Sequence, residues 1–178
     1  MEEKNQIKED NITLIIDKPD YDENSGTAYK PIEVSCKIVV IKKGKSITIT
    51  GSENTIIIPN NVTIAGLTVH GDLNSIINFN NKIIINVIGG MNKISYLAKT
   101  NKAYMALTVQ GNYNLITNDG TPMISTIIGY ENEYRGMRGD RLIFVNRDYK
   151  TEGEDIKVKE VVIDKDYVPH MYYRFRDF

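Results

Sequence analysis

A tetrad of the form Gly-x-x-Asn recurs five times along the chain, and its spacing limits the possible folds. Successive tetrads lie 20, 18, 22 and 18 residues apart. Self-similarity at a period near 20 residues is typical of solenoids, in which each repeat forms one turn of a coil. The recurring pairs are Gly51 and Asn54, Gly71 and Asn74, Gly89 and Asn92, Gly111 and Asn114, and Gly129 and Asn132.

The flanks of the tetrads repeat too, with the two-residue alternation of a β-strand. A β-branched residue stands two positions before each glycine, and an aliphatic or aromatic residue stands two positions after each asparagine. We expect these side chains to face inward: Ile49, Val69, Val87, Val109 and Ile127 before the tetrads, and Ile56, Ile76, Ile94, Ile116 and Tyr134 after them. The positions expected to form a stripe on the outer face are Thr48, Thr68, Asn86, Thr108 and Thr126.

Each tetrad position has a role at a corner of the coil. Glycine supplies an unusual backbone angle. Asparagine tolerates the left-handed conformation, and asparagines on successive coils could form a hydrogen-bonded ladder. A second set of turn-forming residues lies between the tetrads, so each coil should have two sheets and two corners, or a third short side. This set comprises Pro59 to Asn61, Asn78 to Lys82, Lys99 to Asn101, Asn118 to Gly120, and Gly136 to Gly139.

These patterns predict an all-β chain, a single-stranded parallel β-solenoid of about five to six coils with capping terminal segments. Residues 1–30 would supply an N-terminal strand and a polar acidic segment, 31–147 the solenoid, and 148–178 a C-terminal cap or interaction tail. Cys36 lies 18 residues before Asn54. We expect it to occupy the asparagine position of a degenerate first coil, as a buried structural thiol.

The charge distribution bears on possible partners. The net charge is −1, with −5 over residues 1–24, +3 over 25–134 and +1 over 135–178. A near-neutral chain makes nucleic acid an unlikely partner. The N-terminus shows no signal peptide, and no apolar run approaches the length of a membrane span. The sequence therefore suggests a location in the cytoplasm, or within a virion or other assembly.

Catalytic chemistry has weak support in the sequence. Polysaccharide enzymes built on β-helices use paired carboxylates, and the candidates near the tetrads are Glu53, Asp72, Glu131 and Glu133. Solvated corner side chains are the simpler interpretation. Two histidines, His70 and His170, and one cysteine do not make a metal site. We therefore expect no catalytic residue, metal or cofactor.

The candidate partner-binding residues lie after the last tetrad. Arginines could bind a carboxylate, a phosphate or an acidic partner, including the acidic N-terminus of a second copy. Aromatic residues are enriched in interface cores. A solvated end coil and a tail folded back as a cap are the alternatives. The candidates are Arg135, Arg138, Arg141 and Arg147, followed by Tyr172, Tyr173, Arg174, Phe175 and Arg176.

Over residues 36–134 the pattern resembles that of the Gly-x-x-Asn β-solenoid proteins, and the general plan is similar to that of the bactofilins. The latter resemblance implies a short β-helix with tails that polymerises end to end. The leading interpretation is a non-enzymatic structural, assembly or interaction protein that forms a homo-oligomer or binds a protein partner. The alternative is a glycan-binding or polysaccharide-processing β-helix protein.

Overall fold

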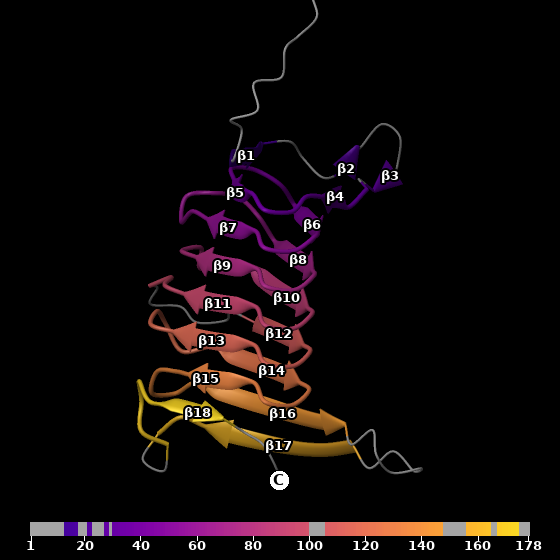
Figure 1. The fold of residues 1–178 in the computed structure, drawn as a ribbon. Helices are drawn as coiled ribbons and strands as arrows, with labels where there is room; N and C mark the ends of the chain where they lie inside the picture. The colour runs from indigo at the N-terminus through magenta and orange to yellow at the C-terminus, as the bar shows by residue number, and fades with distance from the viewer. Residues whose placement is uncertain are drawn as a thin grey trace, which may run out of the picture.

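The computed structural model describes residues 13–17, 21–22, 27–28, 30–99, 106–147, 156–164 and 167–174. In these residues the chain is all-β and winds into a parallel β-solenoid of about six turns, as the repeat predicts (Figure 1). Of the expected corner Lys99 to Asn101, Thr100 and Asn101 lie outside the described residues. The described residues contain no helix that is long and apolar enough to span a membrane.

Two eight-stranded sheets form the walls of the solenoid. In spatial order, the first sheet contains β1 (Thr13–Ile16), β5 (Ile38–Ile41), β7 (Thr55–Ile58), β9 (Ser75–Asn78), β11 (Lys93–Tyr96), β13 (Leu115–Asn118), β15 (Glu133–Arg135) and β18 (Tyr172–Arg174). The second sheet contains β4 (Ile32–Glu33), β6 (Ser46–Thr50), β8 (Gly66–His70), β10 (Ile84–Ile88), β12 (Ala106–Gln110), β14 (Ile124–Ile128), β16 (Arg141–Arg147) and β17 (Ile156–Val162). A separate short hairpin pairs β2 (Tyr21–Asp22) with β3 (Thr27–Ala28).

Strand register places equivalent residues of the repeat on top of one another. Val69 aligns with Val87 and Val87 with Val109, and all three are fully buried. Ile76 and Ile94 form part of the matching column in the first sheet. The inward assignment of the alternating residues is therefore confirmed, and burial of each such aliphatic side chain is worth about 1.5–3 kcal/mol.

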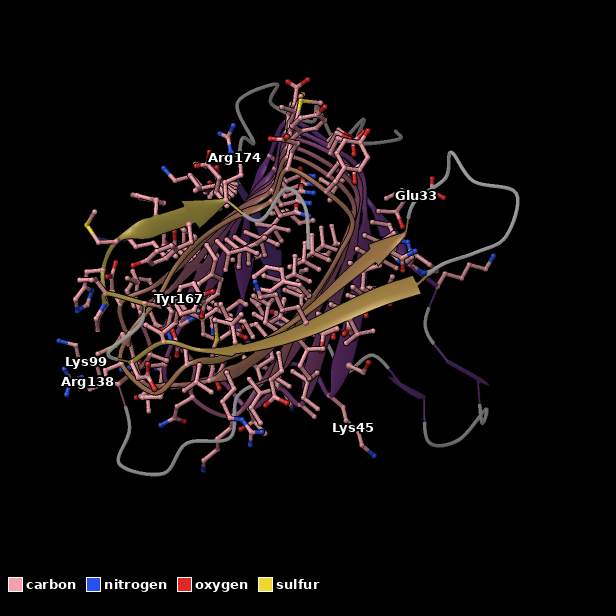
Figure 2. The ribbon with its side chains drawn as sticks, turned by 90° about the horizontal axis from the view of Figure 1, so that it is seen from below. Glu33, Lys45, Lys99, Arg138, Tyr167 and Arg174 are labelled. Carbon is pink, nitrogen blue, oxygen red and sulfur yellow. The ribbon has the colours of Figure 1, made fainter. Side chains whose placement is uncertain are left out.

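The C-terminal end of the solenoid is closed by strands that reverse direction. Strand β17 pairs antiparallel with β16, and β18 pairs antiparallel with β15. Tyr167, between these two capping strands, packs against the hydrophobic core (Figure 2). Solenoid ends expose unpaired strand edges unless something covers them. The described part of the C-terminal segment therefore acts as a cap.

The first coil differs from the prediction at Cys36. The register pairs Ile38 with Thr55, which aligns Lys37 with Asn54 and Cys36 with Glu53. The prediction that Cys36 occupies the asparagine position is therefore wrong by one residue. Cys36 is also exposed rather than buried, because its position points away from the core. Its thiol lies 3.7 Å from the Oε2 atom of Glu53.

Candidate interaction surfaces

The tetrad asparagines form a buried ladder that connects successive coils. The backbone N–H of Asn74 donates to Oδ1 of Asn92 at 2.8 Å, and the N–H of Asn92 donates to Oδ1 of Asn114 at 2.9 Å. The side-chain amide of Asn92 donates to the carbonyl of Gly71 on the preceding coil. The predicted ladder is therefore confirmed, and its side chains are fully occupied in holding coils together.

The left-handed residue of each tetrad is not the asparagine but the residue before it. Its φ lies between 56° and 60° in every coil, including the first. The asparagine side chain has to point inward to reach the next coil, so the bend falls one residue earlier. The six left-handed residues are Cys36, Glu53, Leu73, Met91, Tyr113 and Glu131. Leu73, Met91 and Tyr113 are about half exposed and form an apolar ridge along this corner.

A second ladder runs along the outside of the same corner, and the sequence analysis missed it. It uses the residue after each glycine. The N–H of Asp72 donates to Oγ of Ser52, the N–H of Gly90 donates to Oδ1 of Asp72, and the N–H of Tyr130 donates to Oδ1 of Asn112. The signal in the sequence was a side chain with an oxygen acceptor after four of the five tetrad glycines and at Ser35.

The corner carboxylates do not form a catalytic pair. Glu53 and Asp72 are neighbours on adjacent coils, since the N–H of Glu53 donates to the carbonyl of Asp72. Their side chains engage opposite coils, because Asp72 accepts a hydrogen bond from Gly90 and Glu53 accepts one from Cys36. The carboxylates of Glu131 and Glu133 both pair with Arg174. The partners of these four carboxylates give each of them a structural role.

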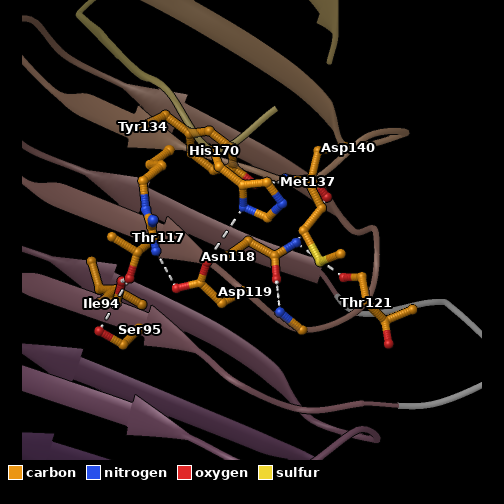
Figure 3. Close-up of polar contacts among 12 residues, drawn as sticks. Ile94, Ser95, Thr117, Asn118, Asp119, Thr121, Tyr134, Met137, Asp140 and His170 are labelled. Carbon is orange, nitrogen blue, oxygen red and sulfur yellow. Dashed lines mark hydrogen bonds and ion pairs between the residues drawn. The ribbon is translucent and has the colours of Figure 1, made fainter. Parts of the chain in front are cut away.

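A buried polar network closes the last turn at the opposite corner (Figure 3). Asp140 is fully buried, and its Oδ1 accepts hydrogen bonds from Nδ2 of Asn118 and the N–H of Met123, both within 2.9 Å. Its Oδ2 accepts hydrogen bonds from the hydroxyl of Tyr134 at 2.9 Å and the N–H of Met137 at 2.7 Å. Burial raises the pKa of the Asp140 carboxyl, although these four donors lower the pKa in part. Burial and the nearby Asp140 raise the pKa of Tyr134 well above its ordinary value, so its hydroxyl remains a donor.

The candidate arginines are spread over both sheets, and three of them pair within the chain. Arg135 pairs with Asp119, which also lies 3.6 Å from Nδ1 of His170 (Figure 3). Arg141 pairs with Glu160 across strands β16 and β17, and Arg174 pairs with Glu131 and Glu133. Arg138 is exposed in the loop before β16.

The remaining candidates divide between the cap and the undescribed end of the chain. Tyr172 places its ring 5.6 Å from the Arg135 guanidinium carbon, and the Tyr173 hydroxyl donates to the carbonyl of Val168. Arg147 ends strand β16. Phe175 and Arg176 lie outside the described residues.

The outer face of the second sheet presents a broad surface with few charges. Along strands β6, β8, β10, β12, β14, β16 and β17, each strand contributes three aligned outward residues. Arg141 and Glu160, which pair with each other, are the charged residues among these 21 described positions, although 25% of the whole chain is charged. The predicted stripe of Thr48, Thr68, Asn86, Thr108 and Thr126 forms most of the middle row.

Large apolar side chains flank this middle row in the C-terminal half of the sheet. Ile84 is 52% exposed, Ile124 is 40% exposed and Val158 is 63% exposed. We call the outward surface of these seven strands the second-sheet face. Its apolar members are Ile84, Ile88, Ile124, Ile128, Ile143, Val145, Val158 and Val162.

Comparison with known proteins gave no match to a family model, to a curated protein or to a solved structure. Among the described residues, no group of three or more His, Cys, Asp or Glu side chains is placed to hold a metal ion.

Proposed function

We propose that this chain is a non-enzymatic structural protein whose rigid β-solenoid presents a lateral surface for self-association or for a protein partner. The observation that carries this proposal is the second-sheet face, where two charged residues occupy 21 outward positions. Interface cores are depleted in charged residues, and contiguous apolar patches on monomers are often functional.

The uses already made of the polar side chains support a structural role. The tetrad asparagines bond adjacent coils, and the Asp72 carboxylate does the same from the outer side of the corner. Glu131 and Glu133 hold the capping strand through Arg174. These side chains maintain the scaffold, and the second-sheet face is left as a surface for a partner.

The geometry favours lateral association over the end-to-end polymerisation that the resemblance to bactofilins implies. The C-terminal end of the rod is covered by the antiparallel strands β17 and β18. The arginines expected to attract an acidic partner end are paired within the chain at Arg135, Arg141 and Arg174. Such pairing reduces the charge available to a neighbouring molecule.

Sedimentation velocity of the full chain from about 5 to 500 μM, at low and high salt, tests this proposal. We expect the weight-average mass to rise with protein concentration and to persist at high salt, because apolar contacts are not screened by ions. A monodisperse monomer throughout would remove self-association. Association that disappears at high salt would instead favour a charge-driven, end-to-end contact.

A further inference from the structure

The second-sheet face is complementary to a copy of itself. Its rows alternate in character, with threonine in the middle and large aliphatic residues on either side in the C-terminal half. The charges of Arg141 and Glu160 neutralise each other, with the Arg141 Nη2 atom 2.5 Å from Oε1 of Glu160. A second copy therefore meets no unpaired charge on this face. A partner of opposite charge would gain nothing from it.

We infer that the partner of this face is a second copy, packed face to face about a two-fold axis parallel to the solenoid axis. This inference rests on the proposed function. The two rods then point in the same direction, and each strand of one copy lies over the same strand of the other. The two outer rows face each other, which places Ile84 opposite Ile88 and Ile124 opposite Ile128 of the second copy. The middle row faces itself.

The reversed two-fold arrangement, with its axis along the strands, fits less well. It would place β17 and β16 of one copy over β6 and β8 of the other. Val158 and Val162 would then lie against the Ser46 and Thr50 positions. Burying apolar residues against hydroxyls sacrifices the gain from apolar contact, and it leaves polar groups poorly solvated. The parallel arrangement avoids this mismatch.

The size of the face sets the expected strength. Seven strands at about 4.8 Å and five residues at about 3.3 Å give a flat area of about 570 Å² per copy, or about 1,150 Å² for two copies. Specific interfaces bury about 1,200–2,000 Å² in total, so this contact is at the lower limit. We therefore expect a reversible dimer rather than a permanent one.

A pair of matched substitutions tests the location of the interface. Ile124 on this face is 40% exposed, and Ile38 on the outer side of the first sheet is 36% exposed. Ile124→Lys should weaken dimerisation at least tenfold by sedimentation, because it introduces a charge opposite Ile128 of the second copy. Ile38→Lys should leave dimerisation unchanged. Circular dichroism and melting temperature should show that both variants remain folded.

Two results would overturn this assignment while leaving self-association intact. One is equal dimerisation by the Ile124→Lys and Ile38→Lys variants. The other is loss of association in Met91→Lys but not in Ile124→Lys, which would place the contact on the apolar ridge of the tetrad corner. A wild-type chain that is monomeric under all conditions would instead remove the proposed function itself.

A chemical cross-link tests the orientation of the two copies. Face-to-face sheets lie about 10 Å apart, too far for a disulfide, so a short bis-maleimide is the suitable reagent. In a Cys36→Ser background, Thr126→Cys should cross-link to itself, since the middle row faces itself. Ser75→Cys, on the outer side of the first sheet, should not. If only Ser75→Cys cross-links, or if Thr126→Cys cross-links only when Asn86→Cys is mixed with it, the parallel arrangement is wrong.

Discussion

Asp140 joins the last turn of the solenoid to the second corner of the preceding coil. Both oxygens of its carboxylate are occupied, each by two donors, and the side chain is fully buried. A buried carboxylate is costly unless it is hydrogen-bonded, which explains why burial raises the Asp140 pKa even with four donors present. The four donors come from Asn118, Met123, Tyr134 and Met137, so one residue links three segments of the chain.

Asp140→Asn should destabilise the protein. An amide nitrogen at either oxygen position would face two hydrogen-bond donors, and each donor left unpaired costs about 1–3 kcal/mol. The midpoint of urea unfolding should fall accordingly. Asp72→Asn is the matched control, because Asn112 performs the same bond to the next coil with an amide oxygen. Equal losses in both variants would contradict the role given to the Asp140 network.

The sequence predicted the repeating residues well and the singular ones poorly. The inward columns through Val87 and Ile94 and the asparagine ladder through Asn92 follow from a five-fold pattern, and the structure confirms them. Asp140 occurs outside that pattern, so its burial depends on how the last turn closes in space. The slot of Cys36 could not be fixed, because a 17-residue first step and an 18-residue step both fit a degenerate coil.

At the scale of the secondary-structure element, the tetrad corner depends on close contact between glycines of adjacent coils. Gly111 has a φ of 142°, in a region that L side chains rarely adopt. An added methyl group there would overlap the carbonyl oxygen of Gly89. The same contact recurs between Gly89 and Gly71, so the glycine column sets how tightly the coils stack.

Gly111→Ala should therefore be strongly destabilising. Backbone strain and overpacking each cost about 1–3 kcal/mol. Gly66→Ala is the control, since its new methyl would lie 3.8 Å from the nearest atom, Oγ of Ser46, and Ala106 already occupies an equivalent position in the same sheet. Thermal unfolding followed by circular dichroism should show a large fall in melting temperature for the first variant and none for the second. A similar fall in both would show that the glycine contact does not govern coil stacking.

At the scale of the whole molecule, the two ends of the rod are built differently. At the N-terminal end, β1 continues the parallel first sheet by pairing with β5, and Ile16 enters the core. At the C-terminal end, the chain reverses and lays β17 and β18 across the last turn. The sequence left the tail open as a cap or an interface. Its pairing with β15 places it within the fold of its own chain.

Deletion of residues 167–178 tests the role of the tail. The deletion removes Tyr167 from the core, the β18 partner of strand β15, and the bond from the His170 N–H to the carbonyl of Gly136 at 2.7 Å. It also leaves Glu131 and Glu133 without Arg174. Because an uncovered strand edge is a template for pairing with other chains, we expect a lower melting temperature and aggregation, measured by light scattering.

A shorter deletion of residues 175–178 keeps β18 and is the control, so its melting temperature and solubility should match those of the full chain. The two deletions also separate a cap from an interface at the C-terminal end. If removal of residues 167–178 gave a soluble, well-folded monomer from a chain that otherwise dimerises, the tail would be the contact between copies. The second-sheet face would then lose its assigned partner. If the truncated chain instead aggregates, while Ile124→Lys gives a folded monomer, the capping role and the lateral interface are independent properties of the same rod.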